Sequence, residues 1–537
     1  MAEQVLLGDE AVALAAIEAG VTAAYAYPGT PSTEILEYIL RWRLRHGRPH
    51  AAWTVNEKTA YEEALGVSFA GRRAIVSMKH VGLNVASDPF MNSAIVGING
   101  GLVVAVADDP GMHSSQNEQD SRFYGDFARV VCLEPGDQQQ AYDMTREAFD
   151  LSERFHIPVM VRLVTRLAHS RAVVRTRAPR EENPLSRTEE PASWILLPGN
   201  ARRQWHKLIE RQKEFAAYSE TCPHNTLELS GSELGVITSG LARNYFLENA
   251  ADLRTRPSHL HIGAYPIPMQ KVRALCEHVS RVLVLEDGYP YVERQLLGLL
   301  APPIAIEGRE SGAVPPDGEL TPDLVRAALG LPPQAGMVAE DLALPNRPPQ
   351  LCAGCPHGDT FTALEKALEG VERRVVTSDI GCYTLGALPP YSAIESCVCM
   401  GASVGMAKGA SDAGLRPAVA VIGDSTFLHS GLTPLIDAVA AGTDMTLIIL
   451  DNKAVAMTGG QPTILSSSAL LDAVIGTGLD RAHLKVIEAH PRNAERNAEV
   501  IRRELEYKGT SVVVAVRECL ETIKARKKET EKLETAS

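Results

Sequence analysis

The sequence predicts an α/β protein of three domains with mainly parallel sheets. Short apolar runs rich in β-branched residues alternate with segments of helical periodicity. Strands that are apolar along their whole length are typical of parallel sheets covered on both faces. Charged and Pro-rich stretches interrupt the alternation, and a chain of 537 residues is too long for one ordinary core.

The expected strands follow from the apolar runs. In the first domain they are 23–27, 51–55, 73–78, 102–107, 129–133 and 158–165; in the second, 234–239, 260–264 and 282–286; in the third, 374–378, 418–422, 446–450, 484–488 and 510–516. The interruptions set the boundaries: a first domain at 1–180, a connecting segment at 181–232, a second domain at 233–330, a linker at 331–350, a third domain at 351–520 and a charged tail at 521–537.

Composition excludes several classes of protein. A net charge of −13 argues against nucleic acid as a partner, because phosphate neutralisation needs a basic face. We expect no membrane span, because no run of eighteen apolar residues occurs, and the N-terminus lacks the features of a secretion signal. The expected location is therefore the cytoplasm. Six of the nine cysteines follow residue 350, and such clustering in a reduced compartment indicates metal binding rather than disulfides.

Two apolar runs of the third domain end in residues with oxygen ligands. Gly423 and Asp424 follow one run, and Asp451 and Asn452 follow the next. Ligands of open parallel sheets bind beyond the carboxyl ends of the strands, and Mg²⁺ takes protein oxygens together with phosphate oxygens. Gly423 would let the backbone approach a phosphate. The same residue types dominate ordinary turns, so this pattern leaves both a metal site and simple turns open.

Longer motifs indicate a family. The chain contains, in order, Tyr27–Glu34 (YPGTPSTE), Met78–Pro89 (MKHVGLNVASDP), Asp108–Asp120 (DDPGMHSSQNEQD), Ser378–Gly386 (SDIGCYTLG), Cys399–Ser403 (CMGAS) and Ala456–Gln461 (AMTGGQ). With the spacing from Gly-Asp-Ser to Asp-Asn, these motifs resemble the large (alpha) subunit of indolepyruvate ferredoxin oxidoreductase. That subunit is part of the thiamine-diphosphate-dependent 2-oxo acid oxidoreductase superfamily, and the resemblance covers nearly the whole chain.

The resemblance implies a pyrimidine-binding domain, a transketolase C-terminal-like domain and a diphosphate-binding domain, in that order. It implies that thiamine diphosphate is bound with Mg²⁺, whose ligands would be the side chains of Asp424 and Asn452 and the carbonyl of Ala454. Ser425 stands where many relatives have glycine, a departure that leaves the metal ligands intact. By the resemblance, the residues that contact the cofactor are Glu57, His357, Cys382, Gly423, Asp424, Ser425, Asn452 and Met457.

The resemblance also implies catalytic residues in the first domain. Glu57 matches the carboxylate that thiamine catalysis needs on the aminopyrimidine ring, although a glutamate there also suits the first turn of a helix. Thr30 lies in the expected substrate loop. It can serve equally as a helix N-cap with Pro31 at the first helical position, and a helix N-terminus also attracts a carboxylate substrate. From their residue type and their place beyond expected strand ends, His80 and His113 are candidate acid–base residues, although a lone histidine is more often structural. Lys79, Gln116 and Gln119 are further candidate donors.

Four cysteines form a candidate redox centre. Cys352 and Cys355, in the turn Cys-Ala-Gly-Cys-Pro-His357, could hold zinc, form a redox pair or ligate an iron–sulfur cluster. Cys382 and Cys519 match the positions at which related enzymes hold the remaining ligands of a [4Fe–4S] cluster. Some of these thiols could instead be buried small hydrophobes. The family pattern also includes a C-terminal ferredoxin-like segment, which we do not find before Ser537.

The sequence therefore predicts the thiamine-diphosphate-binding subunit of an enzyme that converts 2-oxo acids, of which aryl pyruvates such as indolepyruvate are expected, into acyl-coenzyme A. Expected partners are a smaller second subunit, in a dimer of heterodimers, and ferredoxin or another electron acceptor. A non-oxidative thiamine-dependent decarboxylase or lyase is the alternative, and it needs no cluster. A non-catalytic assembly subunit is a third hypothesis, which the presence of Glu57, Asp424 and Asn452 disfavours.

Overall fold

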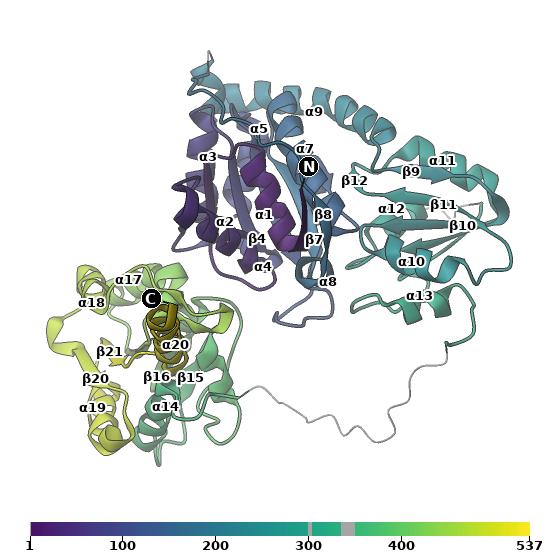
Figure 1. Cartoon of the computed structure of the whole chain (residues 1–537). Coiled ribbons are helices and arrows are strands. Elements are labelled where there is room, and N and C mark those ends of the chain that lie inside the picture. The colour runs from purple at the N-terminus through teal and green to yellow at the C-terminus, as the bar shows by residue number, and fades with distance from the viewer. Residues whose placement is uncertain (1, 189, 299–302, 335–349, 537) are drawn as a thin grey trace. The chain divides into compact units, whose positions relative to one another are not determined.

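The computed structural model describes residues 2–188, 190–298, 303–334 and 350–536. The chain divides into two compact units, residues 1–338 (unit 1) and residues 339–537 (unit 2), and each is described by itself (Figure 1). Unit 1 contains two main sheets and unit 2 contains one. The predicted α/β class with mainly parallel sheets is confirmed.

The larger sheet of unit 1 has seven strands in the order β12-β6-β7-β5-β4-β2-β3, and only the pair β12–β6 is antiparallel. Its central strands are buried along their whole length, as a sheet covered on both faces requires. The strands are β2 (Ala23–Ala26), β3 (His50–Trp53), β4 (Ala74–Lys79), β5 (Leu102–Asp108), β6 (Cys132–Leu133), β7 (Val159–Val164) and β12 (Ala264–Tyr265).

Two groups of mutually packed helices accompany this sheet, and Figure 1 shows α1 in front of it. The first group is α1 (Gly8–Glu18), α2 (Thr33–His46), α7 (Gln138–Phe155) and α8 (Thr165–His169). The second is α3 (Glu57–Phe69), α4 (His80–Val85), α5 (Ser87–Val96), α6 (Arg122–Ala128) and α9 (Pro198–Thr221). Helix α9 lies within the predicted connecting segment, and it packs on α5.

The smaller sheet of unit 1 has the order β14-β13-β10-β11-β9, in which only β9 is antiparallel to its neighbour. Because β12 follows β11 closely but pairs with β6 of the larger sheet, the two sheets share one hydrophobic core. The elements are β9 (Thr226–Glu228), β10 (Gly231–Ser239), β11 (Pro257–Ile262), β13 (Arg281–Leu285), β14 (Ala305–Glu307), α10 (Ala242–Ala250), α11 (Met269–His278), α12 (Tyr291–Leu297) and α13 (Pro322–Ala328).

A buried ion network joins the two sheets of unit 1. Arg122 donates to Asp120 and to Glu286, which follows β13. Arg162, on β7, donates to Asp108 and Glu134. All of these side chains are almost completely buried. Removing one partner of such a network leaves an uncompensated buried charge, which is strongly destabilising.

Unit 2 is built on one five-stranded, wholly parallel sheet in the order β15-β16-β17-β21-β20. Its strands match the five that the sequence predicts for the third domain. They are β15 (Val375–Thr377), β16 (Ala418–Gly423), β17 (Met445–Asp451), β20 (Leu484–Glu488) and β21 (Thr510–Val516). The helices are α14 (Pro356–Ala367), α15 (Ala402–Asp412), α16 (Asp424–Thr426), α17 (Leu432–Ala440), α18 (Ser467–Gly476), α19 (Ala494–Glu506) and α20 (Leu520–Ala536).

Two small antiparallel pairs are absent from the sequence prediction: β1 (Glu3–Leu7) with β8 (Arg171–Arg175), and β18 (Ala454–Val455) with β19 (Gln461–Pro462). Most of the predicted linker at 331–350 lies outside the described residues. No helix in the described parts of the chain is both long enough and apolar enough to cross a bilayer.

Candidate functional site

The strongest candidate site lies at the carboxyl edge of the sheet in unit 2. Strands β16 and β17 are parallel neighbours, with Gly423 opposite Leu450. Asp424 directly follows β16 and Asn452 directly follows β17. The two side chains predicted to bind a metal therefore start from adjacent strand ends, as ligands of an open parallel sheet do.

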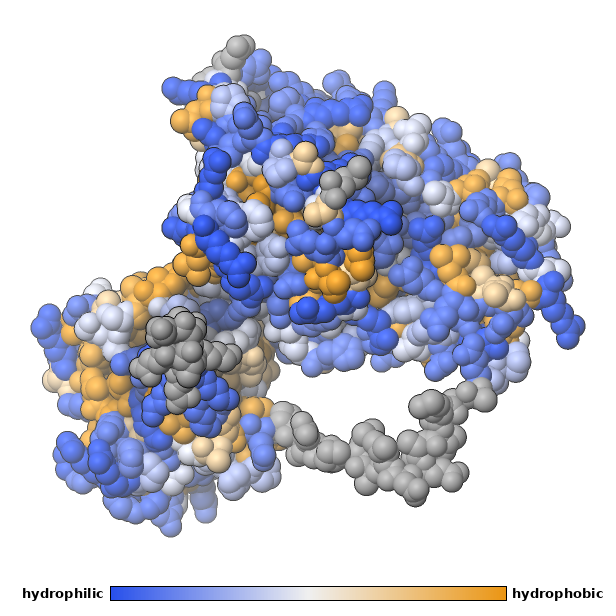
Figure 2. All heavy atoms as spheres, viewed as in Figure 1, coloured by the Kyte–Doolittle hydropathy of each residue, from blue (hydrophilic) through white to orange (hydrophobic). Residues whose placement is uncertain are grey.

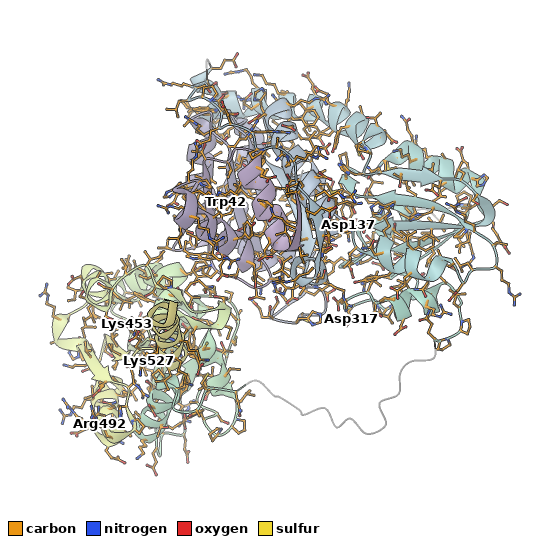
Figure 3. The ribbon with its side chains drawn as sticks, viewed as in Figure 1. Trp42, Asp137, Asp317, Lys453, Arg492 and Lys527 are labelled. Carbon is orange, nitrogen blue, oxygen red and sulfur yellow. The ribbon has the colours of Figure 1, made fainter. Side chains whose placement is uncertain are left out.

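Asp424 is a buried carboxylate held by backbone donors. Its side chain is 3% exposed, and its two oxygens accept from the backbone N–H groups of Ser425 and Lys453, each at 2.9 Å. Lys453, labelled in Figure 3, adopts the left-handed backbone conformation with a φ of 60°. Burial raises the pKa of Asp424 well above its usual value, and the neighbouring carboxylate of Asp451 raises it further. A cation at this place would relieve both effects.

Asn452 links the strand edge to helix α14. Its Nδ2 lies 3.2 Å from Nε2 of His357, and its Oδ1 accepts from the N–H of Ala454 at 3.1 Å. Burial lowers the pKa of His357 to about 4, so the imidazole is neutral at neutral pH and can accept from the amide. Oδ2 of Asp451 is buried without a hydrogen-bond partner among the described residues. This edge is rich in oxygen atoms, carries carboxylates and has one carboxylate oxygen without a hydrogen-bond donor among the described residues. It therefore suits a hard cation such as Mg²⁺.

The remaining residues of the diphosphate motifs surround this edge. A Cβ on Gly423 would lie 2.7 Å from the ring of Tyr383, so the glycine is required by ring packing. The hydroxyl of Tyr383 donates to the buried carboxylate of Asp379, whose pKa burial raises to about 6. Ala454 is buried in β18, whereas Met457 is 51% exposed.

The four predicted cluster cysteines lie near one another. The N–H of Cys355 donates to the carbonyl of Cys352 at 3.0 Å, and the N–H of Cys519 donates to the carbonyl of Asn452 at 3.0 Å. Burial, together with the charges of Cys355, Cys519 and Cys352, raises the pKa of the Cys382 thiol to about 12. All four thiols are free. Cys352 and Cys355 therefore share one turn, and Cys519 lies beside Asn452.

Glu57 of unit 1 lies where β3 leads into α3. Asn56 caps the helix by accepting from the N–H of Thr59 at 2.8 Å, and Glu57 is the first helical residue, only 4% exposed. Its carboxylate lies against Gly82, where a Cβ would be 2.6 Å from Oε1 of Glu57. The carboxylate that the resemblance assigns to the pyrimidine ring is therefore buried and confined.

Two loops meet at Lys79, the last residue of β4. Its Nζ donates to the carbonyl of Ser114 at 3.0 Å, and its side chain packs across Gly29 of the predicted substrate loop, where a Cβ would lie 3.2 Å away. Oγ of Ser114 donates to the carbonyl of Thr30 at 3.3 Å. Burial lowers the pKa of Lys79 to about 8, although Asp109 and Glu57 act in the opposite direction. Thr30 and Lys79 thus belong to one group of contacting residues, which Ser114 connects.

The predicted N-cap role of Thr30 is wrong. Helix α2 begins at Thr33 with Ser32 at the N-cap. Oγ1 of Thr33 accepts from the N–H of Gly29 at 3.0 Å, and Oγ of Ser32 donates to the carbonyl of Gly29 at 2.8 Å. These bonds close a turn over residues 29–33, which delays the helix by two residues.

The two candidate histidines occupy different environments. His80 is buried, its Nε2 lies 3.1 Å from the carbonyl oxygen of Asn117, and burial lowers its pKa. His113 is half exposed and lies 3.3 Å from a carboxylate oxygen of Glu319. Of the two predicted donors on the same loop, Gln116 is exposed and Gln119 is partly buried.

The structure also contains two features that the sequence did not indicate. The ion network around Arg122 and Arg162 fixes the loop that ends at Asp120. Asp9, on α1, is completely buried. Acidic residues at a helix start usually interact with the helix dipole, so only the tertiary fold could distinguish Asp9 from its neighbour Glu10.

Gly82→Ala tests the confinement of Glu57. The new methyl group would overlap the Glu57 carboxylate, and we expect thiamine-dependent activity to fall by about 10- to 100-fold, since a displacement of about 1 Å has such an effect. Gly66→Ala on α3 is the matched control, because a Cβ there meets nothing within 4 Å, and it should keep activity. Steady-state rates and circular dichroism of both variants provide the check; equal activities would show that Glu57 is not so confined.

Two family models match the chain. The model described as "Pyruvate flavodoxin/ferredoxin oxidoreductase, thiamine diP-bdg" matches residues 14–213. The model described as "Thiamine pyrophosphate enzyme, C-terminal TPP binding domain" matches residues 379–515. A 2-oxoglutarate:ferredoxin oxidoreductase structure from Magnetococcus marinus shares the fold, with a TM-score of 0.50 and 16% identity over 61% of this chain and 65% of that one. The two family models indicate a thiamine-diphosphate-dependent 2-oxo acid oxidoreductase, and the fold agrees with that class.

Curated relatives make the assignment more specific. The chain is 37% identical to indolepyruvate oxidoreductase subunit IorA of Archaeoglobus fulgidus and 38% identical to that of Methanothermobacter thermautotrophicus, in both cases over 96% of this chain and 86% of the relative. The subunit IorA of Pyrococcus abyssi is 35% identical over 96% of this chain and 85% of its own length. The chain therefore belongs to the indolepyruvate oxidoreductase IorA family.

Proposed function

We propose that this subunit oxidatively decarboxylates aryl pyruvates such as indolepyruvate, with coenzyme A as acyl acceptor. The balanced reaction converts a 2-oxo acid and coenzyme A into acyl-coenzyme A, CO₂, one proton and two electrons. The observation that carries the proposal is the buried carboxylate pair at the carboxyl edge of unit 2, Asp424 and Asp451, beside Asn452. The names of the relatives support indolepyruvate as the substrate class.

We propose that Mg²⁺ and the diphosphate bind at the carboxyl edge of the sheet in unit 2. The side chains of Asp424 and Asn452 and the carbonyl of Ala454 would hold the ion, and the ion would hold the diphosphate oxygens. Neutral His357, which contacts Asn452, would present a hydrogen bond without adding charge. When bound, thiamine diphosphate supplies the nucleophilic carbon and accepts the electrons left by the departing CO₂.

We propose that Glu57, Lys79 and the loop of Thr30 in unit 1 bind the pyrimidine ring and the substrate. Glu57 would hold a proton at the ring nitrogen of the aminopyrimidine, and its burial would keep water from competing for that proton. Lys79 and the loop of Thr30 would bind the substrate carboxylate, because the cationic side chain of Lys79 packs against that loop at Gly29. Ser114 connects the two through its carbonyl and its hydroxyl. His80 and His113 remain proposed acid–base residues.

We propose that the two electrons of the reaction pass to a [4Fe–4S] cluster. Its ligands would be Cys352, Cys355, Cys382 and Cys519. A single zinc ion would need the sulfur atoms close to one another, but no three of these thiols, all within the described residues, lie within 4.8 Å of one another. A cluster spreads its four ligands over four iron atoms and therefore suits wider spacing. The non-oxidative lyase is the alternative, in which the thiols carry no metal.

The proposed assembly is a dimer of heterodimers in the cytoplasm, with ferredoxin or another carrier accepting the electrons. Exposed large hydrophobics in unit 2, namely Val398, Met406, Ile436, Met457 and Ile464, support a partner surface. Figure 2 shows hydrophobic residues on the surface of this unit.

Anaerobic purification tests the oxidoreductase against the lyase. We expect brown protein with about four iron atoms per chain, and colourless Cys382→Ser protein that still binds thiamine diphosphate. Cys276→Ser is the matched control, because Cys276 is a partly buried thiol of unit 1 outside the proposed cluster, and it should stay brown. Iron analysis, visible spectra and cofactor titration give the result. Colourless wild-type protein with bound cofactor would contradict the cluster. It would move the redox centre to the partner subunit, or favour the lyase if no partner carries one.

A further inference from the structure

Three side chains that can bind metal converge in unit 1, and none of them has a role in the function proposed above. Asp9, Glu34 and His169 each bring one ligand atom to within 4.8 Å of the other two, and within the described ranges they are the one group of three or more that does so. They come from α1, α2 and the end of α8. Two carboxylates and an imidazole are a donor set that suits a divalent transition-metal ion.

Asp9 is the inner member of this group, and it has no hydrogen-bond partner. Its side chain is 0% exposed, and both of its carboxylate oxygens are buried without a partner among the described residues. An unpaired buried carboxylate is costly. The carboxylates of Glu34 and Glu10 increase the cost, because they act together with burial to raise the pKa of Asp9. A bound cation would stabilise the ionised carboxylate, which receives no hydrogen bond from the described residues.

Close packing of three helices explains why Asp9 is held there. A Cβ on Gly8 would lie 2.3 Å from the carbonyl oxygen of Leu167, so the start of α1 lies directly against α8. Helix α1 also packs on α2, whose Trp42 is labelled in Figure 3. The nearby cation Arg41 contacts Glu10 and Glu37, and the structure gives it no bond to Asp9.

Glu34 and His169 form the outer side of the group. Oε2 of Glu34 and Nε2 of His169 form a hydrogen bond of 3.4 Å, which is longer than the usual range of about 2.7–3.2 Å. Two ligands bound at about 2.1 Å to a tetrahedral zinc ion lie about 3.4 Å apart, so this separation matches shared coordination. Their side chains are 33% and 34% exposed, which lets an ion enter from solvent with Asp9 at its inner end.

We propose that Asp9, Glu34 and His169 bind one divalent transition-metal ion, for which Zn²⁺ is the best match, with water completing the coordination. The ion would connect α1, α2 and α8 at the base of the loop that carries Thr30, because α2 begins at Thr33, whose side chain closes that loop. This site does not depend on the thiamine chemistry proposed above. Its role is to hold three helix ends in register.

Metal content and thermal unfolding of the full-length chain test the site. Chelator-treated wild type and Asp9→Asn are loaded with Zn²⁺, dialysed and analysed for zinc. We expect the variant to retain one zinc ion fewer, and its zinc affinity at this site to fall at least about 100-fold. Zinc held by the cysteines contributes equally to both proteins and cancels in the difference. Added Zn²⁺ should raise the melting temperature of wild type more than that of the variant.

Glu10→Gln is the matched control, because Glu10 is the neighbouring acid of α1 but lies outside the group; it should bind zinc as wild type does. His169→Gln gives a second test at a partly exposed position, should Asp9→Asn fail to fold, and it should also lose one zinc ion. Co²⁺ provides an independent readout, since oxygen and nitrogen ligands give visible bands without the thiolate charge-transfer band of cysteine sites. Equal zinc content in wild type, Asp9→Asn and His169→Gln would overturn the proposal.

Discussion

Asp424→Ala is expected to abolish thiamine-dependent turnover and to weaken the binding of thiamine diphosphate with Mg²⁺ by at least about 100-fold. Asp424 is the only charged member of the proposed ligand set, the others being the amide of Asn452 and a backbone carbonyl. The substitution also leaves the N–H groups of Ser425 and Lys453 without their acceptor, so the turn that shapes the edge loses its support. Equilibrium titration of the cofactor, with and without Mg²⁺, measures the effect.

Asp437→Ala is the control for this variant. Asp437 lies on α17 of the same unit, its side chain is 72% exposed, and its ion pair with Lys408 at 3.7 Å is a surface contact, which contributes little. Cofactor affinity should therefore stay at the wild-type value. If Asp424→Ala folds and binds the cofactor as tightly as Asp437→Ala does, the metal site is not at this edge.

The central strands could be predicted from the sequence because burial on both faces leaves an unbroken apolar run. Strand β16 is buried at every position, and the sequence shows it as Ala-Val-Ala-Val-Ile-Gly. The pair β1–β8 carries no such signal, because several of its residues, such as Val5 and Val173, are exposed. Its pairing joins Glu3 to Arg175, a contact between distant parts of the chain that no local pattern indicates.

The residues of the candidate site likewise differ in whether the sequence could predict them. Asp424 and Asn452 could be paired from sequence because each directly follows a predicted strand, and adjacent parallel strands end at one edge. The start of α2 was predicted wrongly, because Pro31 suits a first helical position while the side-chain bonds of Ser32 and Thr33 decide where the helix begins. Burial of a particular acid, such as Asp9, depends on helix packing and has no local signature.

Glu57→Gln is expected to lower kcat by about 10²- to 10⁴-fold, the usual contribution of a positioned proton-transfer group, while the affinity for thiamine diphosphate changes little. Glutamine keeps the size of the side chain, so the contact with Gly82 and the first turn of α3 should survive. It cannot hold a proton as a carboxylate does. Single-turnover rates with indolepyruvate, together with cofactor titration, separate the chemical step from binding.

Glu62→Gln is the matched control on the same helix. Glu62 pairs with Lys58 at the surface, where its side chain is 48% exposed, and losing that pair should leave kcat unchanged. The ratio of the kcat values of the two variants therefore separates the effect of the buried carboxylate from the general effect of neutralising a charge on α3. If Glu57→Gln turns over indolepyruvate as fast as Glu62→Gln does, the pyrimidine ring takes its proton contact from another residue, and the assignment of unit 1 fails at its central point.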